Sequence, residues 1–171
     1  MIFSELPSNP HVRVLDLPRV AALKSRVRGM KIVVDGTLVG PFGFRPLEHG
    51  ADLVVYSLSK YHAGHNDVMA GAVVGPVRVI DALRETRALL GGVLDPQSAY
   101  LLLRGMKTYA LRMQVHQSNA ERVAEFLEGH EAVERVWYPS VPSHPEHDLA
   151  RGLMSGFGGV VSFVVRGGME A

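Results

Sequence analysis

The sequence has no cysteine, and this absence excludes disulfide bonds and thiol chemistry. It also lacks a long hydrophobic run, since no stretch approaches the roughly 18 apolar residues of a membrane-spanning helix. The formal net charge of the 171 residues is only +1, which gives no reason to expect nucleic acid or an acidic partner. The first residues have neither a basic start nor a signal-like apolar core. We therefore expect a soluble, cytoplasmic protein without a membrane anchor.

Apolar residues make up 47% of the chain, which is enough for one core and part of a second. Two short continuous apolar runs, at 32–34 and 53–55, have the pattern of parallel strands that are buried on both faces. Helical patterns alternate with these runs. The alternation predicts an α/β fold with a mostly parallel sheet.

The other expected elements follow from caps, breakers and periodicity. Asp16 is a plausible N-cap of a helix that ends at Gly29, and Pro76 opens a second helix that Gly91 closes. We further expect helices around 99–103 and 120–127, a helical turn at 46–50, strands at 2–3, 70–74, 134–138 and 160–165, and loops at 40–43 and 139–145. The change from buried strands to a long amphipathic helix predicts a domain boundary near residue 110, with domains at 1–110 and 111–171.

Chemistry is concentrated where the two apolar runs end. The first run ends in Asp35, and the second is followed by Ser57, Ser59 and Lys60. In an α/β protein, ligands are held at the carboxyl ends of strands. A cofactor with an aldehyde, a pyridine nitrogen and a phosphate needs an amine, a carboxylate and hydroxyl groups. The pattern therefore predicts a pyridoxal phosphate site, with Lys60 as the Schiff-base amine, Asp35 opposite the ring nitrogen and the serines at the phosphate.

Further motifs occur in a fixed order along the chain. They are Pro-Ser-Asn-Pro at 7–10, Asp-Gly-Thr at 35–37, Ser-Leu-Ser-Lys-Tyr at 57–61, and the segments 64–71, 91–96, 103–108, 143–147 and 156–159. Together they resemble the Cys/Met-metabolism family of pyridoxal phosphate enzymes over nearly the whole chain. The resemblance implies part of an aspartate-aminotransferase-like large domain, followed by the start of an α/β small domain.

Position by position, the resemblance implies five site residues. Lys60 attaches the cofactor and Asp35 partners the pyridine nitrogen. Ser57 and Ser59 match the two hydroxyl positions that hold the phosphate. Asn9 matches an asparagine that bonds the phenolic oxygen of the cofactor.

Two positions depart from the family pattern. Tyr56 stands where many members have histidine, and Gly36 where asparagine is frequent. Neither change removes a group that the cofactor requires. Both are therefore expected to adjust the properties of the site more than to change which cofactor it binds.

The resemblance implies replacement or elimination at Cβ or Cγ of amino-acid substrates. The favoured reaction joins an activated homoserine ester to cysteine and gives cystathionine. The γ-elimination of cystathionine or methionine and the sulfhydrylation of O-acetylhomoserine are alternatives, as is an inactive module that serves only assembly. The resemblance also implies a homo-oligomer, a dimer of dimers in the family.

Family members are more than twice as long as this chain, so the resemblance implies a fragment. The stacking tyrosine of the family, its glycine-rich phosphate loop and its arginine for the substrate carboxylate have no matching positions here. Residues that settle the reaction type are therefore expected outside this sequence.

Two rival interpretations use the same residues. Ser57 and Lys60 satisfy the Ser-x-x-Lys pattern of serine β-lactamases, but the Ser-Asp-Asn and Lys-Thr-Gly motifs of that class are incomplete. His62, His65 and Asp67 have spacings seen at zinc sites, but a further well-spaced ligand is missing. We expect these histidines to shape the loop that follows Lys60.

Overall fold

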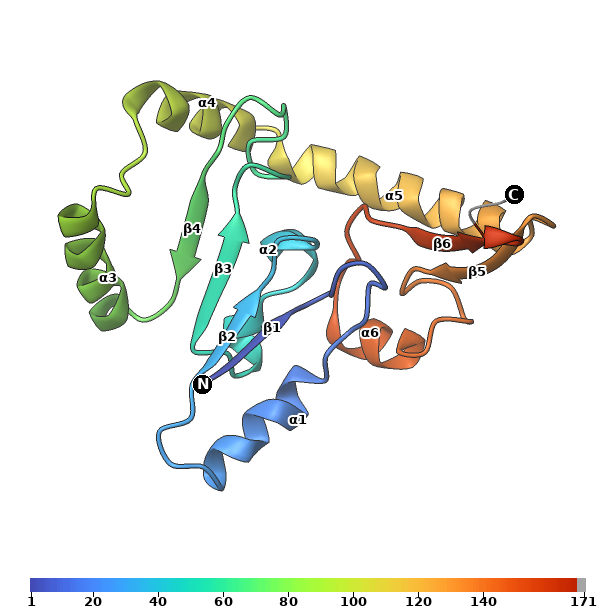
Figure 1. Ribbon diagram of the computed structural model, residues 1–171, viewed down its shortest axis with the longest axis horizontal. Helices are drawn as coiled ribbons and strands as arrows, with labels where there is room; N and C mark the ends of the chain where they lie inside the picture. The colour runs from blue at the N-terminus through green and yellow to red at the C-terminus, as the bar shows by residue number, and fades with distance from the viewer. Residues whose placement is uncertain (169–171) are drawn as a thin grey trace.

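The computed structural model describes residues 1–168, and its centre is a four-stranded sheet (Figure 1). The strands lie in the order of the sequence: β1 (Ile2–Glu5), β2 (Ile32–Asp35), β3 (Leu53–Ser57) and β4 (Gly71–Val74). β1, β2 and β3 run parallel to one another, whereas β4 pairs with β3 in the antiparallel direction. The α/β fold with a mixed, mostly parallel sheet is thus confirmed.

The register of the parallel strands brings their carboxyl ends to one edge. Glu5 lies opposite Asp35, and Asp35 lies opposite Val55. The first three residues of β2 are all buried, which explains why this strand is a continuous apolar run rather than an alternating one. Polar residues therefore appear where the parallel strands leave the core, at their carboxyl ends.

Helix α1 (Leu17–Ala22) begins as the sequence predicts but ends early. The Asp16 side chain accepts a hydrogen bond from the Arg19 backbone N–H at 3.0 Å, so it caps the helix. The prediction that the helix continues to Gly29 is wrong, because a short 3-10 helix η1 (Leu23–Ser25) replaces its second half. Val27 is 53% exposed, so a further helical turn would bury no apolar side chain there.

Two short helical segments lie between β2 and β3. The expected loop at 40–43 is instead a single helical turn, α2 (Gly40–Gly43), and its first residue has a φ of 62°. The Tyr109 hydroxyl fills the space that a Cβ would need at Gly40. The expected turn at 46–50 is the 3-10 helix η2 (Pro46–His49), which ends at Gly50 in the left-handed conformation.

Three helices follow β4. They are α3 (Val77–Leu90), α4 (Pro96–Met106) and α5 (Tyr109–Glu128). Gly91 ends α3 in the left-handed conformation, and the Asp95 side chain caps α4 by accepting a hydrogen bond from the Ser98 N–H at 2.9 Å. Figure 1 shows α5 running from the loop beyond β3 toward a second, small sheet. None of the helices formed by residues 1–168 is both long and apolar enough to cross a membrane.

The second sheet pairs β5 (Val133–Trp137) with β6 (Ser162–Val165) in the antiparallel direction. Between them lies α6 (His147–Leu153), which the sequence analysis missed. This helix has only seven residues and follows a stretch rich in proline, so its periodicity is too short to recognise.

Apolar side chains form two larger clusters. The first is built from residues between 6 and 56 together with Ala150 of α6 and Met154, which follows this helix. The second is built from α5, β5 and the residues just after β5. The second cluster lies wholly beyond residue 110, but α6 packs into the first, and the boundary at 110 stays a prediction.

Candidate active site

Asp35 and Ser57 are the last residues of two neighbouring parallel strands. The Gly36 N–H donates to the Val55 carbonyl at 3.0 Å, which continues the pairing one step past Asp35. Side chains alternate along a strand, so the register places Asp35, Val55 and Ser57 on one face of the sheet. The two polar residues therefore meet at the same edge and on the same face.

Thr37 ties these two strand ends together. Its backbone N–H donates to Asp35 Oδ1 at 2.9 Å, and its hydroxyl accepts a hydrogen bond from the Ser57 N–H at 2.8 Å. Within residues 1–168 the Asp35 carboxylate makes no ion pair. It is thus oriented by the backbone, and its charge is left to face a cation such as a protonated pyridine ring.

Lys60 follows β3 in a tight turn and is exposed. The Lys60 N–H donates to the Ser57 carbonyl at 3.3 Å, and its own carbonyl accepts from the Gly64 N–H at 2.9 Å. Lys24 and Lys31 lie beside Asp52, at 2.6 and 3.3 Å, whereas the Lys60 amine has no hydrogen-bond partner among the described residues. An amine that is free of other partners is what imine formation with an aldehyde requires.

The hydroxyl groups of Ser57 and Ser59 differ in their hydrogen bonds. Ser57 Oγ has no hydrogen-bond partner in the described part of the chain. Ser59 Oγ accepts from the Ala70 N–H at 2.8 Å and lies 3.3 Å from the Ala70 carbonyl as a donor. A phosphate oxygen at Ser59 must compete with that carbonyl, but only against a long and weak hydrogen bond.

Asn9 follows β1 on the same edge of the sheet. Its backbone N–H donates to the Glu5 carboxylate at 2.9 Å, and its side chain is exposed. Since Glu5 lies opposite Asp35, the loop that carries Asn9 leaves the sheet beside the Asp35 strand end.

The donor set fits pyridoxal phosphate. An oriented carboxylate, a free amine and a free hydroxyl stand at one sheet edge, on Asp35, Lys60 and Ser57. When bound, this cofactor withdraws electrons from the Cα of an attached amino acid, and Asp35 would hold its ring nitrogen while Ser57 and Ser59 would hold its phosphate.

Sequence reasoning missed Thr37, Tyr61 and Arg112 as functional residues. Thr37 and Tyr61 lie inside the motifs at 35–37 and 57–61, but the motifs alone do not indicate what these side chains contact. The Tyr61 hydroxyl accepts a hydrogen bond from the Gly159 N–H at 3.1 Å, and burial raises the pKa of this hydroxyl while that bond partly offsets the rise. No local pattern marks Arg112, whose contacts span some 50 residues.

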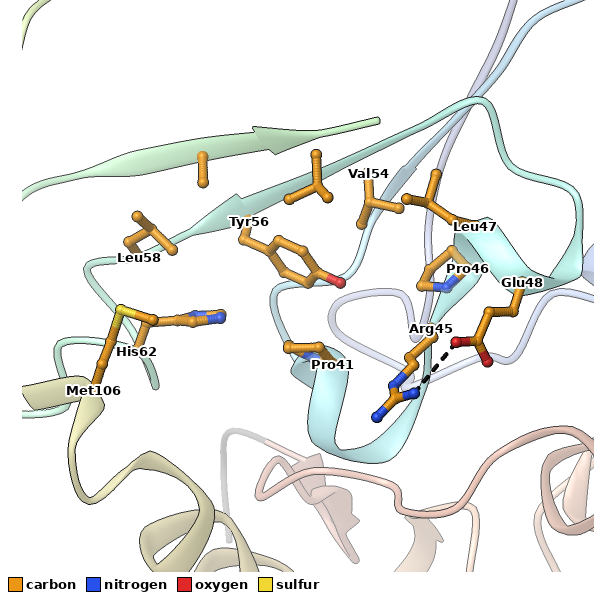
Figure 2. A pocket seen from close by; sticks show the side chains of 12 residues that line it. Pro41, Arg45, Pro46, Leu47, Glu48, Val54, Tyr56, Leu58, His62 and Met106 are labelled. Atoms are coloured by element: carbon orange, nitrogen blue, oxygen red, sulfur yellow. Dashed lines mark hydrogen bonds and ion pairs between the residues drawn. The ribbon is translucent and has the colours of Figure 1, made fainter. Parts of the chain in front are cut away.

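A pocket of about 400 Å³ lies on the other face of β3 (Figure 2). Its wall includes Val54, Tyr56 and Leu58, which alternate with the residues of the Ser57 face. Figure 2 shows Tyr56 and His62 among the lining side chains, with His62 beside Met106, and the ring centroids of Tyr56 and His62 are 5.3 Å apart. Burial, aided by the Asp35 charge, raises the pKa of the Tyr56 hydroxyl, whereas burial and the nearby Arg112 cation lower the pKa of His62.

The zinc interpretation finds no ligand cluster in the described part of the chain. No group of three or more His, Asp or Glu side chains within residues 1–168 is arranged to hold a metal ion. His62 is buried and stacks on Tyr109 with ring centroids 4.8 Å apart, while His65 and Asp67 are exposed.

Comparison with known proteins gives the family. All 171 residues match the family described as Cys/Met metabolism PLP-dependent enzymes. The chain belongs to this family. The assignment made from the motifs is confirmed, and with it the family's dependence on pyridoxal phosphate.

Among relatives in this family, the chloroplastic cystathionine gamma-synthase 1 of Arabidopsis thaliana is 47% identical over 170 residues, covering 99% of this chain and 30% of that protein. The L-methionine gamma-lyase of Fusobacterium nucleatum subsp. polymorphum is 40% identical, covering 100% of this chain and 44% of that protein. The crystal structure of cystathionine gamma synthase from Xanthomonas oryzae pv. oryzae in complex with aminoacrylate and cysteine superposes with a TM-score of 0.94 at 41% identity. It covers 98% of this chain and 43% of that one. The chain thus spans less than half the length of these relatives.

Proposed function

We propose that this chain carries one wall of a pyridoxal phosphate site, with Lys60 as the residue that holds the cofactor covalently. The observation that carries the proposal is the joining of the Asp35 and Ser57 strand ends by Thr37, with the free Lys60 amine in the next turn. Asp35 partners the ring nitrogen, Ser57 and Ser59 bind the phosphate, and Asn9 bonds the phenolic oxygen.

We further propose that the protein carrying this wall joins an activated homoserine ester to cysteine and forms cystathionine. The identity of 46–47% to two plant enzymes named cystathionine gamma-synthase 1 supports this reaction over the alternatives. Lys60 would move protons at the substrate carbons as a general acid and base, and the bound cofactor would supply the electron-withdrawing group. Asp35 stabilises positive charge opposite its carboxylate during these transfers.

Methionine γ-elimination is the second candidate. Several L-methionine gamma-lyases are 38–44% identical over the whole chain, only slightly below the plant synthases. A single assay separates the two reactions: an O-acylated homoserine with cysteine yields cystathionine in one, and methionine yields methanethiol in the other.

We infer small amino-acid substrates, a homo-oligomer built as a dimer of dimers, and a cytoplasmic location. The large exposed apolar side chains of α3, such as Val77 at 75% and Leu89 at 88%, support burial of this surface in a larger assembly.

Lysine trapping tests the cofactor assignment. The protein is incubated with pyridoxal phosphate, reduced with borohydride and digested, and the modified peptide is mapped. We expect the label on Lys60 and its loss in Lys60→Arg. Lys107→Arg is the matched control, because Lys107 is also exposed but lies at the end of α4, and this variant should keep the label. Label concentrated on Lys24, Lys31 or Lys107 would refute the assignment.

A further inference from the structure

The turn that carries Lys60 ends against the side chain of Arg112, in the first turn of α5. One guanidinium nitrogen, Nη1, donates to the Tyr61 carbonyl at 2.7 Å, and the other, Nη2, donates to the His62 carbonyl at 3.2 Å. Nη2 also donates to the Gly105 carbonyl of α4 at 2.9 Å. A single side chain thus joins the Lys60 turn to two helices.

The same guanidinium is itself held in place. Arg112 Nε donates to the Thr108 hydroxyl at 3.1 Å, so all three nitrogens of the planar guanidinium make hydrogen bonds. Gly64, with a φ of 77°, leaves room for it, because a Cβ at that residue would collide with the guanidinium. Gly105 likewise lets α4 approach the backbone of Ala63 directly.

These bonds satisfy carbonyl groups that the turn leaves unpaired. Ala63 and Gly64 donate their N–H groups to the carbonyls of Leu58 and Lys60, so the turn is wound like the end of a helix. Within residues 1–168 the Tyr61 and His62 carbonyls accept no backbone N–H, and a cation is the favoured partner at such an end. Hydrogen bonds from a charged donor are about twice as strong as neutral ones.

We propose that Arg112 is a positioning residue that fixes the turn beyond Lys60 and thereby aims the Lys60 amine. The proposal deepens the assignment of Lys60 and rests on it for the chemical consequence. Tyr61 supports the same turn through its hydroxyl, which accepts a hydrogen bond from the Gly159 N–H. Without Arg112 the turn loses the two hydrogen bonds that hold its Tyr61 and His62 carbonyls, so Lys60 samples a wider range of positions.

Three variants test the proposal: Arg112→Gln, Arg112→Lys and, as the matched control, Arg122→Gln. Arg122 lies on the same helix and is exposed, without a side-chain hydrogen bond or ion pair among residues 1–168. The first measurement is amide hydrogen exchange across residues 60–66 in the absence of cofactor. We expect exchange about tenfold faster in Arg112→Gln, a smaller effect in Arg112→Lys and none in the control. Unchanged exchange in Arg112→Gln would overturn the proposal.

The second measurement is the ratio of borohydride-trapped cofactor on Lys60 to that on Lys107. We expect this ratio to fall about tenfold in Arg112→Gln and by less in Arg112→Lys. An equal fall in Arg122→Gln, or no fall in Arg112→Gln, would overturn the proposal. If wild-type Lys60 takes no label at all, the cofactor assignment fails, while the exchange data still decide whether Arg112 fixes the turn. Should Arg112→Gln fail to fold, exchange in Arg112→Lys decides the same question.

Discussion

The Tyr56 ring occupies the space that a side chain at residue 36 would need. A Cβ atom at Gly36 would lie 2.8 Å from Cε1 of Tyr56, closer than real side-chain contacts allow. Gly36 and Tyr56 are the two positions at which the sequence departs from the common family pattern. The two departures are therefore linked in the structure: the absence of a side chain at Gly36, after β2, makes room for the Tyr56 ring on β3.

This pairing predicts non-additive stability changes. Gly36→Asn should lower the free energy of unfolding by about 1–3 kcal/mol, because the added side chain overpacks against the ring. Tyr56→His in the same chain should recover part of the loss. Urea unfolding of the wild type, both single variants and the double variant gives the coupling energy, which we expect to be about 0.5–3 kcal/mol. Strictly additive changes would contradict the pairing.

Replacing Asp35 by asparagine should harm chemistry more than cofactor capture. Asparagine keeps the shape of the side chain but removes the charge that faces the pyridine nitrogen. We expect turnover to fall about 10²-fold or more, with trapping on Lys60 nearly unchanged. The measurement belongs in a chimera that joins this chain to the remaining part of the Xanthomonas oryzae enzyme, so that cystathionine formation can be assayed.

The matched control for that experiment is Asp67→Asn, since Asp67 is exposed in the loop beyond Lys60. It should leave both turnover and trapping at wild-type levels. Near-normal turnover in Asp35→Asn would show that another group partners the ring nitrogen.

The 171-residue chain alone should bind pyridoxal phosphate weakly. The candidate residues supply only one side of the cofactor, and two absent charge-assisted hydrogen bonds, each worth about 1.5–3 kcal/mol, weaken binding by about 10²- to 10⁴-fold. Titration followed by absorbance measures the affinity, and an O-acylated homoserine with cysteine tests turnover. Tight stoichiometric binding with steady cystathionine formation would contradict this expectation.

Stability should fall as the pH is lowered from about 7 toward 5. Burial, with the Arg112 cation, holds the pKa of His62 below its ordinary value of 6.5 in the folded chain. The unfolded chain therefore binds the proton first, and the stability present above pH 6.5 is lost as the pH falls toward the folded pKa. The binding of one such proton changes the free energy of unfolding by up to about 1.4 kcal/mol per pH unit.

His62→Phe should reduce this pH dependence, because phenylalanine keeps the aromatic contact with Tyr109 and cannot be protonated. His116→Phe is the control, since His116 is exposed and lies on α5. Denaturant unfolding at pH 7.5 and 5.5 gives the difference for each protein. An unchanged pH dependence in His62→Phe would refute the role of this histidine.

The sequence predicted those parts of the fold that depend on neighbouring residues. The strands at the two apolar runs, the Asp16 cap and the glycine that ends α3 are local features, and all are confirmed. Burial of a whole run on both faces is confirmed for β2 alone, because Leu53 and Val55 of β3 are only partly buried. The extent of α1 was wrong because it depends on what the helix packs against, and α6 was missed because its stability comes from the first apolar cluster rather than from its own periodicity.

The distinction between local features and long-range contacts also applies to the candidate site. Asp35, Ser57 and Lys60 were found because each follows a recognisable strand, and their individual roles stay predictions. The roles of Thr37 and Arg112 depend on side chains reaching backbone groups 20 to 51 residues away. Such contacts are fixed by the packing of strands and helices, which no window of sequence contains.

The contacts between Ser59 and Ala70 close the loop of residues 60–69 at its base. Beyond this closure, Gly64, His65, Asn66 and Asp67 are all exposed. An insertion at this tip, such as a short peptide tag, would lengthen a loop that is already closed, at a cost that grows only with the logarithm of loop length. The tip is therefore a place to attach a probe near Lys60 without disturbing the pairing of β3 with β4.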